Sequence, residues 1–108
     1  MTAAIVAVDP GLSGAIAVLD EDGELVELFD TPTVTTTTNR REISASALAA
    51  ILRKFPGTPA AVERVGPRPG EGAVGAFAFG HGFGTVLACL AVVVKLFVAK
   101  IDQLKGVF

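Results

Sequence analysis

The stretch IVAVDPGLSGAIAV, residues 5–18, decides the fold of this 108-residue chain. Its first four residues continue an apolar run that is typical of a strand covered on both faces. The Pro10–Gly11 pair forces a turn, and a second apolar run follows over residues 14–19. We therefore expect two buried neighbouring strands, with Asp9 at the end of the first.

The rest of the chain has the pattern of an α/β domain. Asp22–Gly23 is a strong hairpin signal, and apolar residues recur at helical spacing between residues 43 and 55. The further predicted elements are a third strand over 25–29, a loop over the threonine-rich segment 31–39, a helix over 43–55, a short fourth strand over 60–62 and a second helix within 73–94. The predicted order is β-β-β-α-β-α around a mixed sheet.

Glycines complicate the second helix. Each glycine in a helix interior costs about 1 kcal/mol relative to alanine, and this segment carries several: Gly75, Gly80, Gly82 and Gly84. Two explanations stay open. Either the helix begins late, near Phe83, or it packs so closely on the sheet that side chains have no room there.

Charge is divided unevenly along the chain. Residues 1–39 contain seven acids and no Lys or Arg, a net charge of −7, whereas residues 40–108 contain nine bases and four acids, a net charge of +5. The overall charge of −2 hides this division. Asymmetry of this kind is a signal for an interaction with nucleic acid.

Composition also limits the setting of the protein. A hydrophobic content of 51% excludes intrinsic disorder. The single cysteine, Cys89, forms no internal disulfide, so we expect a reducing, cytoplasmic compartment with Cys89 as a small buried residue rather than a reactive thiol. The longest strongly apolar stretch, residues 83–94, is too short to cross a bilayer, and we therefore expect no membrane partner.

Two carboxylates stand out because each follows a buried strand. If the first and fourth strands are parallel neighbours, Asp9 and Glu63 meet at the carboxyl edge of the sheet, where α/β folds place their sites. Two close carboxylates repel each other unless a cation lies between them or one takes a proton. Oxygen ligands without His or Cys favour Mg²⁺ or Mn²⁺ over zinc. The alternative is structural: Asp9 caps the turn, and Glu63 is a solvated strand end.

Three segments together resemble the RuvC family of Holliday junction resolvases, particularly its shorter phage-type members. Residues 5–18 resemble the family's first hairpin, residues 61–72 its second acidic strand and following loop, and residues 75–84 the next helix. The match covers residues 3–91. The resemblance implies a ribonuclease H-like fold and a divalent-metal endonuclease that cuts four-way DNA junctions in recombination and repair, usually as a homodimer.

The resemblance also implies roles for individual residues. The family's first two metal-binding acids carry over to Asp9 and Glu63, as catalytic ligands of Mg²⁺ or Mn²⁺. In the family, the loop and the start of the helix reach the centre of the junction, so Phe77 or Phe79 would stack on an opened base pair; otherwise both belong to the core. The candidate DNA-binding residues are Arg40, Arg41, Arg64, Arg68, Phe77 and Phe79.

The resemblance ends near residue 91. The family continues with a strand and a last helix that carries two more metal ligands, whereas residues 92–108 resemble neither and contain one acid, Asp102. We therefore expect a nuclease core over 1–91, a divergent apolar tail over 92–108, a fold incomplete at its C-terminus, and weak or no cleavage by this chain alone. Two alternatives remain: an actin-like or acetate-kinase-like nucleotide-binding fragment, and a catalytically dead fragment that binds DNA or a partner.

Overall fold

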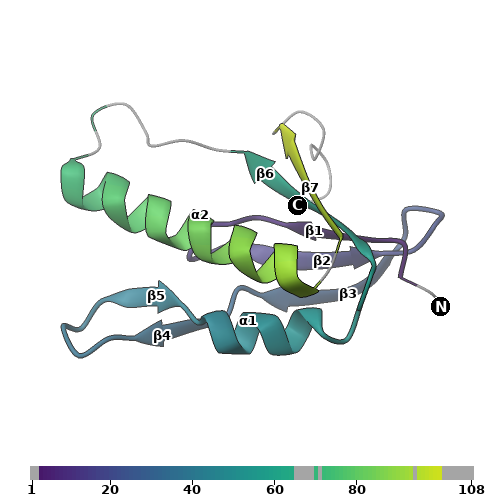
Figure 1. Cartoon of the computed structure of the whole chain (residues 1–108), viewed down its shortest axis with the longest axis horizontal. Helices are drawn as coiled ribbons and strands as arrows, with labels where there is room; N and C mark the ends of the chain where they lie inside the picture. The colour runs from purple at the N-terminus through teal and green to yellow at the C-terminus, as the bar shows by residue number, and fades with distance from the viewer. Residues whose placement is uncertain (1–2, 65–69, 71, 94, 101–108) are drawn as a thin grey trace.

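A five-stranded mixed sheet forms the centre of the molecule, in the order β3-β2-β1-β6-β7 (Figure 1). The computed structural model describes residues 3–64, 70, 72–93 and 95–100. The strands of this sheet are β1 (Ile5–Val8), β2 (Ala15–Leu19), β3 (Leu25–Asp30), β6 (Pro59–Arg64) and β7 (Lys95–Lys100). Strands β1, β2 and β3 pair antiparallel, whereas β6 pairs parallel with both β1 and β7. The predicted mixed α/β sheet is confirmed.

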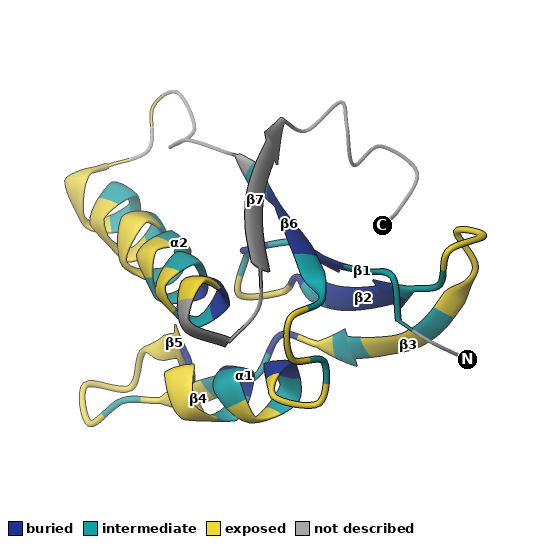
Figure 2. Ribbon diagram, turned by 45° about the vertical axis from the view of Figure 1, so that its right-hand side comes forward, coloured by how far each residue is buried: buried dark blue, intermediate teal, exposed yellow. Residues whose placement is uncertain are grey.

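Two helices, α1 (Ala45–Leu52) and α2 (Ala73–Val93), pack on the sheet and close the core. Alternate strand residues such as Val8 and Val62 point to these helices, because successive side chains of a strand face opposite sides. The helices contribute fully buried side chains to the same cluster: Leu48, Leu52, Val86 and Leu90. Figure 2 shows the buried residues concentrated in the central strands and on the inner sides of the helices.

Helix α1 is shorter than the predicted range of 43–55. It begins after Ser44, whose hydroxyl accepts a hydrogen bond from the backbone N–H of Ala47 at 3.3 Å. Serine is a preferred N-cap because its oxygen satisfies an otherwise unpaired donor of the first turn. Ile43 contributes to the helical periodicity in the sequence, but it lies in the preceding strand.

The segment predicted as a loop over 31–39 instead contributes to a hairpin. Strand β4 (Thr33–Thr35) pairs antiparallel with β5 (Arg41–Ile43) as a separate two-stranded sheet. Threonine is β-branched and favours strands, and Asn39 takes the positive φ of 62° that the turn requires. The loop prediction was wrong for residues 33–35, because it gave no weight to the strand preference of the threonines, whereas residues 36–39 do connect the two strands.

Helix α2 begins at Ala73, so the late start near Phe83 is wrong. A Cβ atom added at Gly80 or Gly84 would meet nothing within 4 Å, so close packing does not explain those two glycines. At Gly82 the added Cβ would lie 3.4 Å from the Ile43 side chain of the hairpin. This is ordinary van der Waals contact, so close packing explains none of these three glycines, and the neighbour at Gly82 is β5 rather than the central sheet.

One described helix segment, Ala73–Ala91, is long and apolar enough to cross a membrane by length and composition, with a mean hydropathy of 1.6. Its apolar character begins ten residues before the stretch 83–94, on which the expectation of no membrane partner rested. In the structure this helix lies against the sheet and α1, with Val86 and Leu90 in the core.

Strand β7 lies beyond the boundary that the sequence resemblance gave for the core. It hydrogen-bonds in parallel to β6 over its whole length, from Pro59–Lys95 to Arg64–Lys100. Residues 95–100, expected in a divergent tail, are therefore part of the central sheet. Local sequence could not show this, because the pairing joins two segments separated by α2.

Candidate functional site

Asp9 and Glu63 lie side by side at the carboxyl ends of two parallel strands. Val8 of β1 is paired with Val62 of β6, and each acid is the next residue along the chain. Adjacent strands of a sheet are about 4.8 Å apart. The condition set by the sequence, that these strands be parallel neighbours, is met, and the two acids occupy equivalent positions.

The turn after Asp9 is closed by hydrogen bonds among its own residues. The Gly11 N–H donates to the Asp9 carboxylate Oδ1 at 3.2 Å, and the Gly14 N–H donates to the Gly11 carbonyl at 3.0 Å. A Cβ atom added at Gly14 would overlap the Asp9 carbonyl oxygen and lie 3.0 Å from Asp9 Cγ. The turn therefore requires glycine at position 14, and it holds the Asp9 carboxylate by the backbone. The capping role considered for Asp9 is thus present, and it uses one of the two carboxylate oxygens.

The environment of Glu63 disfavours its charged form. Burial raises the pKa of the Glu63 carboxyl above its ordinary value, and the neighbouring Asp9 carboxylate raises it further. Desolvation and a nearby like charge both penalise ionisation. A cation placed between the two carboxylates would reverse this penalty, since it would be attracted to both.

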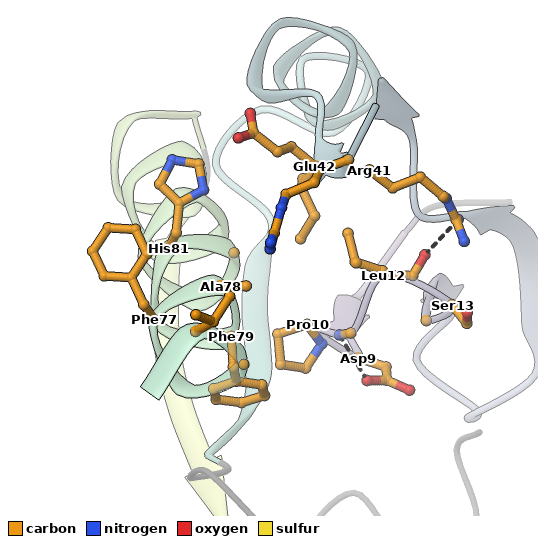
Figure 3. A pocket seen from close by; sticks show the side chains of 17 residues that line it. Asp9, Pro10, Leu12, Ser13, Arg41, Glu42, Phe77, Ala78, Phe79 and His81 are labelled. Carbon is orange, nitrogen blue, oxygen red and sulfur yellow. Dashed lines mark hydrogen bonds between the residues drawn. The ribbon is translucent and has the colours of Figure 1, made fainter. Parts of the chain in front are cut away.

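A cleft of about 1090 Å³ opens beside Asp9, between the hairpin and the N-terminal half of α2. Its floor is the turn from Asp9 to Gly14. Figure 3 shows α2 on one side of this cleft, the β5 residues on the other, and Asp9 at one end. The predicted residues that line it are Asp9, Arg40, Arg41, Phe77 and Phe79. Glu63 lies beside Asp9 on the neighbouring strand but does not line the cleft.

Two contacts hold the hairpin to the body of the protein at this cleft. The Arg41 guanidinium Nη2 donates to the Leu12 carbonyl at 3.3 Å, and Ile43 is buried against α2 at Gly82. Arg41 shares a face of the hairpin with Ile43, since they are two residues apart on one strand. The Arg41 side chain thus bridges β5 and the turn that follows Asp9.

The two phenylalanines have different surroundings. Phe77 is 77% exposed, so the core assignment is wrong for this residue. Phe79 is partly buried and stacks on Phe83, with ring centroids 6.2 Å apart. His81 is exposed on the cleft wall, one helical turn from Phe77 (Figure 3). Of these two phenylalanines, Phe77 is the one with an open aromatic surface.

Three residues of the sequence analysis fall outside this description or at its margin. Arg64 is the last residue of β6, at the carboxyl edge next to Glu63. Arg68 and Asp102 lie outside the described residues.

Cys89 is partly buried, and this burial raises the pKa of its thiol, while the nearby Arg53 charge partly opposes the increase. That direction favours the inert thiol expected from the sequence.

The donor chemistry of the acid pair fits a hard divalent cation. Among the described residues, no group of three or more His, Cys, Asp or Glu side chains is placed to hold a metal ion. Mg²⁺ is commonly bound by one or two carboxylates and completes its octahedron with waters and substrate phosphates. Asp9 and Glu63 would supply such a pair of carboxylates.

The cleft was not predicted from the sequence, and Asp30 was not among the candidate site residues. Asp30 pairs with Ala15, which in turn accepts a hydrogen bond from the Asp9 N–H, so Asp30 and Asp9 share one row of the sheet. They are two strands apart, about 10 Å, which is too far to share one ion directly. The cleft depends on the hairpin that was predicted as a loop, and no local signal could have located it.

No family model matches this sequence, and no curated protein is similar to it. The fold, in contrast, is similar to 13 chains of solved structures. It is a mixed α/β fold of the RuvC type, which is ribonuclease H-like. One of the similar structures is that of Thermus thermophilus RuvC, with a TM-score of 0.57 and 20% sequence identity over 94% of this chain. The match spans 66% of the Thermus chain, so the two differ in length as well as in sequence.

Proposed function

We propose that this chain is a divalent-metal-dependent endonuclease domain that acts on DNA at four-way junctions, as the RuvC-like fold and the sequence resemblance suggest. One observation carries the proposal: Asp9 and Glu63 occupy equivalent positions at the ends of parallel neighbouring strands. Unpaired carboxylates at this distance penalise each other, as the raised pKa of Glu63 indicates. A divalent cation bound by both carboxylates would explain why they lie so close together, whereas a solvated strand end would not.

In this proposal Asp9 and Glu63 hold Mg²⁺ or Mn²⁺. When bound, such an ion activates water and stabilises the charge that develops on a scissile phosphate. Two glycines of the turn orient Asp9 and leave room beside it for the ion and a phosphate. The Gly11 N–H fixes one carboxylate oxygen of Asp9, and Gly14 leaves the backbone of the turn open.

The DNA would approach across the carboxyl edge and the adjacent cleft. Arg40 and Arg41 line that cleft, and Arg64 ends β6 beside Glu63. Arginines at these positions would position phosphates, which supply most of the affinity in protein–DNA binding. The proposed setting is the cytoplasm, with the chain acting as a homodimer on the two-fold arrangement of a junction.

Cleavage by the residues described here should be weak. Two carboxylates give a low metal affinity compared with a fuller set of protein ligands, because more of the shell is left to water. The proposal is therefore a junction-binding domain with residual, metal-dependent nicking activity.

The test is a nicking assay on synthetic four-way junctions in Mn²⁺ and in Mg²⁺. We expect junction binding that weakens as salt is raised, and slow cleavage that Asp9→Asn and Glu63→Gln both abolish while binding persists. Cleavage that survives Asp9→Asn would come from a contaminant or another site, and would overturn the assignment of the acids. Absence of any DNA binding, together with saturable binding of ATP, would overturn the nuclease proposal and support a nucleotide-binding domain.

A further inference from the structure

Strand β3 forms an open edge of the central sheet. It is the terminal strand in the order β3-β2-β1-β6-β7, so one of its two edges pairs with no other strand of the described sheet. Figure 2 shows β3 at the border of the sheet, with much of its length exposed. Such an edge presents backbone N–H and C=O groups that can pair with a strand of another chain.

Two leucines give this edge an apolar surface. Leu25 and Leu28 are 54% and 59% exposed. Their partners on β2 are Leu19 and Ala17, which alternate with the core residue Val18. Because successive residues of a strand face opposite sides, both leucines lie on the face of the sheet away from the helices.

A β-bulge places the two leucines on one face. Residues three apart on a regular strand point to opposite sides. The register between β2 and β3 shifts between Val18 and Leu19, and Val26 is the extra residue of β3 at this shift. Bulges of this kind re-aim side chains at sheet edges. Leu25 and Leu28, the edge leucines, therefore share the face away from the helices.

The charged side chains of β3 and of the turn before it are all acidic. Residues 20–30 contain six acids and no Lys or Arg. Asp20 closes the turn, since its Oδ1 accepts hydrogen bonds from the backbone N–H groups of Asp22 and Glu24, each at 2.9 Å. The exposed acids around the edge leucines are Glu21, Asp22, Glu24, Glu27 and Asp30. This part of the surface therefore repels nucleic acid and attracts basic groups.

This charge discriminates between possible occupants of the edge. A second copy of β3 would bring acids against acids, and like charges opposite each other on paired strands are destabilising. Lys54 does not relieve that repulsion on the leucine face, because its ammonium lies over the Phe29 ring at 5.2 Å. Phe29 is paired with the core residue Ile16 and so lies on the helix side of the sheet. The edge therefore favours a partner strand of opposite charge.

We propose that the β3 edge binds an extended, basic segment of a partner protein as an added strand. The backbone of that segment hydrogen-bonds to β3, its apolar side chains cover the edge leucines, and its Lys or Arg side chains pair with Glu24, Glu27 or Asp30. In this mode of recognition main-chain hydrogen bonds supply affinity and alternate side chains supply specificity. Strand β3 does not line the cleft and is separated from β1 by β2, so this interaction does not depend on the proposed nuclease function.

The test measures the binding of three short synthetic peptides to the full chain by isothermal titration calorimetry. The first peptide alternates valine with lysine, the second alternates valine with glutamate, and the third is the first with all its backbone amides N-methylated. We expect the lysine peptide to bind, with an affinity that falls as salt is raised, and the glutamate peptide not to bind. The N-methylated peptide keeps the charge but loses the backbone donors. It should bind about tenfold more weakly or less, as expected for the loss of two or more hydrogen bonds.

Substitutions in the protein locate the site. Leu25→Ala/Leu28→Ala should weaken binding of the lysine peptide about twofold to thirtyfold, the range for two apolar cross-strand pairs. Val34→Ala removes a comparably exposed apolar side chain from β4, and should have no effect. Glu27→Gln should weaken binding about 1.5-fold to fivefold at low salt. Glu42→Gln removes the same charge from an exposed position of β5, and should leave binding unchanged.

Amide hydrogen exchange gives an independent readout. An added strand takes up the backbone groups of the edge, so the lysine peptide should slow exchange at amides of β3 and not at those of β4. Attraction by charge alone would leave the exchange rates of β3 as they are.

Several results would overturn the proposal. Absence of binding by the lysine peptide, or equal binding of its N-methylated form, would exclude an added strand. Binding that Leu25→Ala/Leu28→Ala and Glu27→Gln leave unchanged would place the peptide elsewhere. If the wild-type chain dimerises in sedimentation and Leu25→Ala/Leu28→Ala is monomeric, a second copy rather than a basic partner occupies the edge. These measurements involve neither DNA nor metal, so their failure leaves the nuclease proposal standing.

Discussion

Asp9 and Glu63 lie next to each other at the ends of parallel strands, one residue beyond the Val8–Val62 pair. Burial and the Asp9 charge both raise the pKa of Glu63. The folded protein therefore carries an electrostatic cost at this edge of the sheet. Functional sites often contain such local costs, because the groups are arranged for a ligand rather than for stability.

The first prediction concerns pH. Because the pKa of Glu63 is raised in the folded state above its ordinary value of about 4.5, the folded state binds the proton more tightly than the unfolded state does. Stability from this group is fully present below pH 4.5 and is lost as pH rises through the raised pKa. Glu63→Gln, which cannot ionise, should therefore be more stable than the wild type at pH 7, and this advantage should disappear at pH 4.

Urea denaturation in EDTA at the two pH values measures this difference. Glu27→Gln, at an exposed position of β3, serves as the control and should show no such advantage. A Glu63→Gln variant that is less stable than the wild type at pH 7 would contradict the prediction.

The second prediction concerns divalent metal. A ligand that binds only the folded state at ten times its dissociation constant stabilises that state by about 1.4 kcal/mol, which corresponds to roughly 5–10 °C in Tm for a domain of this size. Mn²⁺ should raise the Tm of the wild type in this way, and Asp9→Asn or Glu63→Gln should remove the increase. Asp22, an exposed acid in the turn between β2 and β3, provides the control. The Asp22→Asn variant should keep the increase in Tm that Mn²⁺ produces. An equal shift in all variants would mean that the ion binds elsewhere.

Local sequence was sufficient for the part of the fold that holds the acids. The apolar runs on either side of Asp9–Gly14 predicted β1 and β2, and the run before Glu63 predicted β6, because strands covered on both faces are apolar throughout. The parallel pairing of β1 with β6 was only a condition in the sequence analysis, and the structure supplies it. The adjacency of Asp9 and Glu63 followed from that pairing.

The elements that were not predicted from the sequence, β4, β5 and β7, have no local apolar pattern that identifies them. The strands of the β4–β5 hairpin carry mainly threonines and charged residues, with Ile43 as their one buried side chain, so no apolar periodicity marks the hairpin. Strand β7 is recognised only by its pairing with β6. Predicting the cleft requires both the local elements, such as the hairpin, and the way in which distant segments pack together. It forms where the turn after Asp9, the hairpin and α2 meet, and these segments are far apart in the sequence.

The third prediction concerns the turn that holds Asp9. A Cβ atom at Gly14 would overlap the Asp9 backbone, so Gly14→Ala should lower the free energy of unfolding by about 1–3 kcal/mol, the usual cost of overpacking. It should also reduce metal binding, because the Asp9 carboxylate would move. Gly80→Ala should instead raise stability by about 0.5–1 kcal/mol, since the position is helical and open. Chemical denaturation of both variants measures the contrast, and a tolerated Gly14→Ala would show that the turn is less constrained than its geometry indicates.

The last prediction concerns a buried hydroxyl beside the same turn. The Thr31 N–H donates to the Gly14 carbonyl, but its side-chain Oγ1 is buried and has no hydrogen-bond partner among the described residues. A buried polar group without a partner costs about 1–3 kcal/mol. Thr31→Val keeps the shape and removes the polar atom, so it should raise the free energy of unfolding by about 1 kcal/mol. Thr36→Val should act in the opposite direction, because the Thr36 hydroxyl accepts a hydrogen bond from the Arg40 N–H at 3.2 Å. If Thr31→Val destabilises the protein instead, its hydroxyl must have a bound water or another partner that stabilises the turn beside Asp9.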